Sequence, residues 1–189
     1  PRTEHVLALM AIRDRDLNIQ QMIELSIRLC QGLDFLHQNN ITHRDVKPEN
    51  FLFSRDLKQV KIVDFGLSKS SASWRTRWIK EGGGTRRYMS PEQLAKRSLD
   101  ARSDIFSLGL TLYEFLTGRH PCSGNDANEI MRQIRSSKYK FDPPSRYNPE
   151  IPSALDRIVL KALRRQPEHR YQSVTEMLLD MARIAESRI

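Results

Sequence analysis

The chain has 189 residues, of which 39% are hydrophobic and 29% charged, a composition that predicts one globular domain and argues against disorder. No stretch approaches the roughly 18 uncharged apolar residues of a membrane span, so we expect no membrane segment in this chain. The net charge of +8 comes from scattered basic pairs without interleaved aromatic residues, which favours a solvated basic surface over nucleic-acid binding. Two cysteines, Cys30 and Cys122, lack metal-type spacing and indicate no disulfide framework, which favours a reducing, cytoplasmic compartment.

The N-terminal part predicts one strand and one long helix. Residues 5–10 form a short apolar run typical of a strand, and the polar residues 11–18 are typical of a connection. From about Ile19 to His37, apolar residues recur at spacings of three and four, which predicts a helix with one apolar face. Asn39 and Asn40 end this helix, because asparagine tolerates the left-handed backbone that follows many helices.

Two short strands and a long loop are predicted next. Residues 50–53 and 60–63 are strand-like and are joined by a polar turn at Arg55 and Asp56. A loop of about two dozen residues follows at 66–90, rich in Ser, Thr, Arg and Gly, and loops of that length are usually functional.

The remainder predicts successive helices. One helix has an apolar stripe and ends at Gly118, and two others are expected to begin with capping boxes, Ser153 with Asp156 and Ser173 with Glu176. The fold class is therefore mainly α, with a small β element near residues 50–63. The residues of the first stripe are Ile105, Leu108, Leu112 and Phe115.

Two short segments carry residues suited to chemistry. His-Arg-Asp-Val-Lys-Pro-Glu-Asn occupies residues 43–50, and Asp-Phe-Gly at 64–66 follows after thirteen residues. Transfer of a phosphoryl group requires a positioned nucleophile and positive charge on the moving group. Asp45 could accept the proton of an attacking hydroxyl, and Lys47 could neutralise the phosphoryl group. Asn50 and Asp64 supply oxygen ligands of the kind that Mg²⁺ takes.

These segments resemble the catalytic loop and the metal-binding triplet of the protein kinase family. Alone, either segment would most often be an ordinary surface stretch or turn. Three further segments match the family in order: Gly-Thr at 84–85 with Tyr-Met-Ser-Pro-Glu at 88–92, Asp-Ile-Phe-Ser-Leu-Gly at 104–109, and Arg170. The match extends over about residues 20–185, and we identify the chain as the C-terminal lobe of a Hanks-type Ser/Thr protein kinase resembling the bacterial ones. Such descent predicts the fold and does not by itself establish activity.

The resemblance implies ATP and Mg²⁺ as cofactors and a protein substrate. It implies Asp45, Lys47 and Asn50 as catalytic residues. Lys47, Asn50 and Asp64 would contact the bound nucleotide, with Asn50 and Asp64 holding the metal. The residues implied in structural roles are Asp104, in the central helix, and Glu92 and Arg170, as an ion pair.

Substrate class and regulation are also implied by the resemblance. Lys47, two positions after the catalytic Asp, and Thr85 are typical of Ser/Thr kinases and not of Tyr kinases. Arg44 implies control through phosphorylation of the activation segment, because a phosphate there would pair with this arginine. Thr85 is more typical of a structural or substrate-facing hydroxyl. The candidate phosphate acceptors are Ser70, Ser71, Ser73 and Thr76.

The chain departs from the family pattern at its N-terminal end. Complete kinases carry a Gly-rich loop and a strand Lys before the catalytic loop, whereas here no glycine precedes Gly32 and no lysine precedes Lys47. We therefore expect residues 1–18 to be a remnant of the small lobe and hinge. Residues 19–186 would form the large lobe, with the catalytic loop at 43–50 and the activation segment at 64–92.

Two functions stay open at this point. The chain could be the catalytic lobe of a Ser/Thr kinase, which transfers the γ-phosphate of ATP when complete, or a kinase-like docking module without activity. A small-molecule kinase is disfavoured by the full activation segment and by Arg170. The surface that would contact a small lobe could also support self-association.

Overall fold

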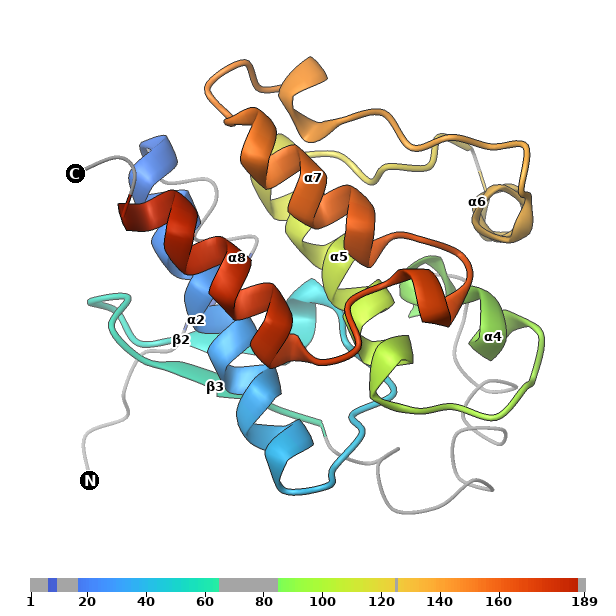
Figure 1. Ribbon diagram of the computed structural model, residues 1–189, viewed down its shortest axis with the longest axis horizontal. Coiled ribbons are helices and arrows are strands. Elements are labelled where there is room, and N and C mark those ends of the chain that lie inside the picture. The colour runs from blue at the N-terminus through green and yellow to red at the C-terminus, as the bar shows by residue number, and fades with distance from the viewer. Residues whose placement is uncertain (1–6, 10–16, 65–84, 125, 187–189) are drawn as a thin grey trace.

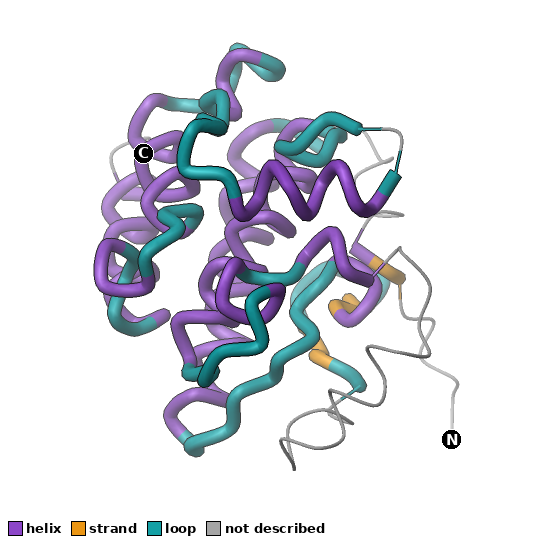
Figure 2. The backbone as a smooth tube through the Cα atoms, turned by 90° about the vertical axis from the view of Figure 1, so that its right-hand side faces the viewer, coloured by secondary structure: helices purple, strands orange, loops and turns teal. Residues whose placement is uncertain are grey.

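The computed structural model describes residues 7–9, 17–64, 85–124 and 126–186. Helices make up most of the fold, and the short strands gather at one side of the helical body (Figure 2). Helix α2 packs against α8, and α5 packs against α7 (Figure 1). The strands are β1 (Leu7–Ala8), β2 (Phe51–Phe53) and β3 (Val60–Ile62), and the helices are α2 (Ile19–Gln38), α4 (Pro91–Leu94), α5 (Ala101–Thr117), α6 (Ala127–Arg135), α7 (Ser153–Ala162) and α8 (Val174–Glu186). Short 3-10 turns lie at Pro48–Asn50, Thr85–Tyr88, Pro144–Arg146 and Pro167–His169. The predicted mainly helical class with a small β element is confirmed.

Helix α2 has the predicted position and polarity. Its apolar residues are buried at the spacing of three and four seen in the sequence. It begins at a capping box that the sequence analysis did not single out, in which the Asn18 side chain accepts the Gln21 N–H at 2.9 Å and the Gln21 side chain accepts the Asn18 N–H at 3.0 Å. The helix ends at Asn39, and Asn40 has the expected left-handed backbone with φ of 57°.

Helix α5 is buried on nearly all sides. The predicted stripe lies within it, yet most of the other residues of the helix are buried as well, because other elements surround it. Gly109 allows α7 to approach closely, since a Cβ at this position would lie 3.0 Å from the Cβ of Ala162. The helix stops at Gly118, which adopts the left-handed conformation with φ of 76°.

The three strands form one antiparallel sheet in the order β1-β2-β3. Phe51 pairs with Ile62 and Phe53 with Val60, which confirms the predicted hairpin. The Val63 N–H also donates to the Asn50 carbonyl at 2.9 Å. The hairpin therefore brings the end of the 43–50 segment beside the start of the Asp-Phe-Gly segment.

Helix α7 begins at Ser153, but the predicted capping box was wrong. The residue before the helix is Pro152, and neither Ser153 nor Asp156 caps it. Asp156 instead accepts hydrogen bonds from the N–H and the hydroxyl of Ser145, at 2.8 and 2.6 Å, because the neighbouring 3-10 turn offers these donors.

The second capping box was half right. Ser173 accepts the N–H of Glu176 at 3.2 Å, but the Glu176 carboxylate accepts from Gln172, one residue earlier than expected. Of the predicted long loop at 66–90, Thr85–Tyr88 forms a 3-10 turn, and positions up to 84 lie outside the described residues. In the part of the chain that the structure describes, no helix has both the length and the apolar composition to cross a membrane.

Candidate active site

The 43–50 segment is held by one buried carboxylate on α5. Asp104, whose residue is 1% exposed, accepts the backbone N–H groups of His43 and Arg44, each at 2.7 Å. It also accepts from Nε2 of His37 at the end of α2, at 2.9 Å. A single side chain thus joins two helices to the loop and sets the direction in which the loop leaves its anchor.

His43 links the same loop to the hairpin. The Asp45 N–H donates to His43 Nδ1 at 3.3 Å, so the ring proton lies on Nε2, which donates to the Val63 carbonyl at 3.1 Å. Because His43 is fully buried, these bonds satisfy its ring away from water. His43 is thus a positioning residue that was not predicted, although its place in the His-Arg-Asp motif was an available signal.

The structure brings Asp45, Lys47 and Asn50 into one cluster. The Lys47 ammonium lies 2.9 Å from Asp45 Oδ2, with side-chain exposures of 11% and 5%. The Asn50 amide nitrogen donates to the Asp45 carbonyl at 2.7 Å and to Asp45 Oδ2 at 3.2 Å. Because Lys47 and Asn50 hold the Asp45 carboxylate in a defined orientation, it can accept a proton from a hydroxyl group placed at one fixed site beside it.

Asn50 and Asp64 offer oxygen ligands on the two sides of the hairpin. The Asn50 nitrogen is directed at Asp45, and its Oδ1 has no hydrogen bond with any described residue, which fits a metal ligand. Asp64 is half-buried, with a left-handed φ of 66°. Among the described residues no group of three His, Cys, Asp or Glu side chains could hold a metal alone. Mg²⁺ does not need such a group, because it binds through one or two carboxylates together with waters and substrate phosphates.

The backbone is strained at two positions of the site. Arg44 and Asp64 both have positive φ, 68° and 66°, without being glycine. Such conformations cost about 1 kcal/mol or more and cluster at functional sites, where the surrounding contacts maintain them. For Arg44 those contacts include the Asp104 carboxylate on its N–H and the Gln93 amide on its carbonyl, at 2.8 Å.

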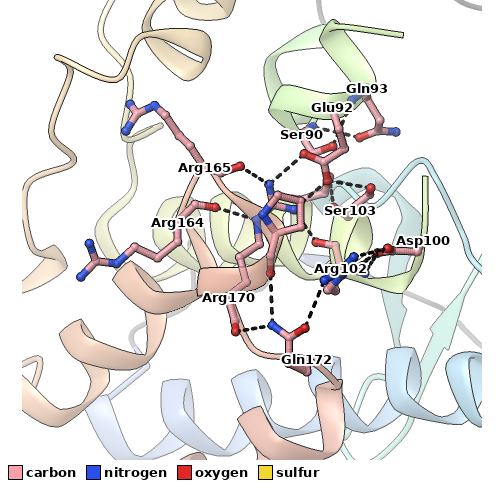
Figure 3. Close-up of polar contacts among 12 residues, drawn as sticks. Ser90, Glu92, Gln93, Asp100, Arg102, Ser103, Arg164, Arg165, Arg170 and Gln172 are labelled. Atoms are coloured by element: carbon pink, nitrogen blue, oxygen red, sulfur yellow. Dashed lines mark hydrogen bonds and ion pairs between the residues drawn. The ribbon is translucent and has the colours of Figure 1, made fainter. Parts of the chain in front are cut away.

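A second buried hub joins Glu92 and Arg170 (Figure 3). Arg170 donates to both carboxylate oxygens of Glu92, at 2.7 and 2.8 Å. It also donates to the carbonyls of Arg164, Arg165 and Arg102, at 2.6, 2.7 and 2.8 Å. Burial by itself would raise the pKa of Glu92, but the Arg170 guanidinium and the Ser103 hydroxyl hold that pKa below its ordinary value.

Helix α4 connects this hub to the catalytic loop. Ser90 and Gln93 form a capping box, with the Ser90 hydroxyl accepting the Gln93 N–H at 3.3 Å and the Gln93 amide oxygen accepting the Ser90 N–H at 2.9 Å. The same Gln93 amide reaches the Arg44 carbonyl. Sequence reasoning missed Gln93, although the Ser-x-x-Gln spacing was a usable signal.

The predicted regulatory residues are only partly within the described structure. Two buried guanidinium nitrogens of Arg44, Nε and Nη1, have no hydrogen-bond partner among the described residues. Thr76 lies outside the described residues, together with the other candidate acceptors, and Thr85 begins a 3-10 turn. Phosphorylation of this segment stays a prediction.

Comparison with known proteins agrees with this geometry. The family model for the protein kinase domain matches residues 3–181. The chain belongs to the protein kinase family. Within this kinase chain, the matched range includes the Asp45 cluster, the Asp104 anchor and the Glu92–Arg170 hub.

Curated relatives point to one branch of the family. The serine/threonine-protein kinase PknB of Mycobacterium leprae is 44% identical over 167 residues, which cover 87% of this chain and 26% of the relative. PknB of Mycolicibacterium smegmatis is 40% identical over 172 residues, covering 89% and 27%. A probable serine/threonine-protein kinase of Streptomyces coelicolor is 38% identical over 170 residues, covering 88% and 25%. The chain thus spans about a quarter of the length of these relatives.

Proposed function

We propose that this kinase chain is a catalytic lobe that transfers the γ-phosphate of ATP to Ser or Thr hydroxyls of proteins. The observation that carries the proposal is the buried contact of Asp45 with Lys47 and Asn50, beside a hairpin whose last strand, β3, ends shortly before Asp64. The similarity to serine/threonine-protein kinases supports the same substrate class. The proposed division assigns residues 19–186 to the large lobe and residues 1–18 to the last strand and hinge of the small lobe.

Each residue of the cluster has a distinct task in this proposal. Asp45 orients the acceptor hydroxyl and takes its proton while the acceptor oxygen bonds to the γ-phosphorus. The bond from that phosphorus to the β–γ bridging oxygen breaks at the same time, and ADP leaves. Lys47, already held against Asp45, places positive charge beside the transferred group. Asn50 and Asp64 would hold Mg²⁺, which when bound neutralises the phosphate oxygens. Asp104 and His43 act indirectly, because they position the backbone that carries Asp45.

A docking function without catalysis is the second candidate. Within these 189 residues no glycine precedes Gly32 and no lysine precedes Lys47, so the chain alone offers neither a Gly-rich cover for the phosphates nor a strand lysine. Correct positioning of the reactants can lower a reaction barrier by about 7–11 kcal/mol, and a cleft with only one wall loses much of that lowering. We therefore expect the separate chain to have little or no transfer activity.

A chimeric kinase tests the proposal. Residues 19–186 would replace the matching segment of the Mycobacterium leprae relative, so that a small lobe is supplied. Labelled ATP, Mg²⁺ and a generic basic protein would serve as substrates. We expect transfer to Ser and Thr that falls by at least about 100-fold in Asp45→Asn, in line with the loss of a general base. The matched control is Asp56→Asn, because Asp56 is an exposed aspartate in the hairpin turn.

The outcomes separate the two functions. A folded chimera that binds ATP but transfers nothing would favour the docking module. Transfer by the separate chain that disappears in Asp45→Asn would contradict our expectation for the chain alone. Self-association is a further part of the proposal and is tested by sedimentation of the separate chain against the chimera. A cytoplasmic site of action fits the two free, buried cysteines and is tested by fractionation of the native cells.

A further inference from the structure

Two clefts adjoin each other at Arg165 and Gln166, in the segment between α7 and α8. The basic cleft has a volume of about 530 Å³, and the adjoining cleft has about 770 Å³. Arg165 and Gln166 line both, so the two hollows share a wall. Neither cleft includes Asp45, Lys47, Asn50 or Asp64, so both are separate from the candidate active site.

The basic cleft combines a cationic rim with an apolar floor. No aspartate or glutamate is among the described residues that line it. Lys140 and Arg164 are exposed on its rim, and neither has an ion pair within the described structure. The floor consists of Phe141, Leu160 and Leu163, and the basic lining residues are Lys140, Arg164, Arg165 and His169.

Arg165 is held in place between the two clefts. Its Nε donates to the Ile134 carbonyl at 2.9 Å and one terminal nitrogen donates to the Gln133 carbonyl at 3.1 Å. Its guanidinium lies 4.9 Å from the centre of the Phe141 ring. Because its geometry is already set by these bonds, Arg165 would lose little conformational entropy on binding an anion.

The backbone beneath the rim is also fixed. Arg170 donates to the carbonyls of Arg164 and Arg165, so the Glu92–Arg170 hub holds both residues from behind. Figure 3 shows their side chains extending away from that hub. The adjoining cleft adds Arg97 and Arg135, both exposed and without ion pairs among the described residues. It also holds two exposed carboxylates, Glu168 and Asp100, and Asp100 is paired with Arg102.

The apolar floor and the ring contacts discriminate among acidic partners. Single-stranded nucleic acid would need open aromatic faces for base stacking. Phe141, the aromatic residue of this floor, is already in contact with Arg165 and with the rings of Phe106 and Tyr139. A membrane surface would need exposed apolar anchors, and the large exposed apolar side chains of the described structure, such as Phe35 and Leu179, do not line either cleft.

We infer that the basic cleft is a docking site for an acidic peptide segment of a protein partner. Carboxylates of the peptide would contact Lys140, Arg164 and the fixed Arg165, and an apolar residue of the peptide would cover the partly exposed Leu160 and Phe141. The more acidic end of the peptide belongs in the basic cleft, because the exposed Glu168 and Asp100 would repel it from the adjoining one. In this proposal, part of the chain's net charge of +8 serves to bind an acidic partner.

Fluorescence anisotropy with a labelled ten-residue peptide of Glu and Asp around one Leu tests this inference. ATP is left out, so the result does not depend on the proposed catalytic function. We expect the Lys140→Glu/Arg164→Glu double variant to bind about tenfold or more weakly than the unaltered chain, because each reversal replaces an attraction with a repulsion. The matched control is Arg55→Glu/Lys58→Glu, which changes the net charge equally at the exposed hairpin turn.

Several results would overturn the inference. Equal weakening of peptide binding in Lys140→Glu/Arg164→Glu and in the control would show that the peptide is attracted by net charge alone. Absence of binding to the peptide at 150 mM salt would exclude a docking site, since a Debye length of about 8 Å leaves only close contacts. A ten-nucleotide single-stranded DNA is compared with the peptide in the same assay. If the DNA binds as tightly as the peptide and is weakened equally by Lys140→Glu/Arg164→Glu, the cleft is a nucleic-acid surface instead. Lys140→Gln/Arg164→Gln, with its fold checked by circular dichroism, guards against misfolding and should show a smaller loss in the same direction.

Discussion

Arg170 is the residue whose replacement tests the structural argument most directly. All five N–H donors of its guanidinium are used, two by the Glu92 carboxylate and three by backbone carbonyls. The residue is 2% exposed, and its guanidinium lies 4.9 Å from the centre of the Phe106 ring. The conservative change Arg170→Lys keeps the charge but offers three donors in place of five.

The expected loss follows from the number of acceptors left without a partner. At least two buried acceptors lose their hydrogen bonds in Arg170→Lys, and each unsatisfied group costs about 1–3 kcal/mol. We expect the free energy of unfolding to fall by about 2 kcal/mol or more. Arg170→Met would also leave the buried Glu92 charge unpaired, which costs about 3–5 kcal/mol. Because domains of this kind are stable by about 5–15 kcal/mol, the Met variant could unfold, and Lys is the better test.

Urea unfolding at pH 7.5, followed by far-ultraviolet circular dichroism, measures the loss. Arg183→Lys is the matched control, because the Arg183 side chain is 75% exposed and contacts Asp180 at the surface. That control should change stability by about 0.5 kcal/mol or less. If Arg170→Lys were as stable as Arg183→Lys, the hub would not depend on the guanidinium fork, and our reasoning would be refuted.

The same hub predicts an acid-dependent effect. The pKa of Glu92 is lower in the folded chain than its ordinary value of 4.5, because pairing with Arg170 and Ser103 outweighs burial. Its ionisation therefore stabilises the fold above about pH 4.5, and this contribution disappears as the pH falls through the lower folded pKa. The stability difference between the unaltered chain and Glu92→Gln should shrink over that acidic range. A constant difference down to pH 3 would contradict the assignment.

Three further predictions concern buried groups elsewhere. Burial lowers the pKa of His120 from 6.5 to about 4, so the unfolded chain takes up a proton at a higher pH than the folded chain does. The folded chain should therefore lose about 2 kcal/mol of stability between pH 7.5 and 5, measured by urea unfolding. The same pH dependence in His120→Gln would exclude this. Gly109→Ala should lower the melting temperature more than Gly32→Ala does. The new Cβ meets the rigid Cβ of Ala162 at position 109, but the flexible end of Ile62 at position 32. Equal melting temperatures of the two variants would contradict this prediction. Burial raises the pKa of Cys30 and of Cys122 to about 12. A thiol reagent at pH 8 should therefore label neither cysteine in the folded chain and both in urea. Rapid labelling without urea would contradict their burial.

Elements with a strong local pattern were predictable from sequence. Helix α2 extends over Ile19–Gln38, one residue beyond the predicted end, because its apolar spacing and the terminal asparagines are local signals. The hairpin was predicted for the same reason. The capping box at Ser153 failed because Asp156 bonds to Ser145, a partner from another turn that no local spacing reveals.

The sequence by itself indicated which residues could perform phosphoryl transfer and where α2, α5, α7 and α8 would lie. Those properties depend on residue type and on spacings within a few turns. Only the tertiary structure decided that Asp104 would anchor the loop 60 and 61 residues away. It also decided that Arg170, which the family resemblance pairs with Glu92, would donate to the carbonyls of Arg102, Arg164 and Arg165. The basic cleft has the same origin. Lys140 is distant in sequence from Arg164 and Arg165, and it joins them only because the segment after α6 packs against the end of α7. Hydrogen bonds and charges of this kind act through space, so their partners are set by packing and not by position in the chain.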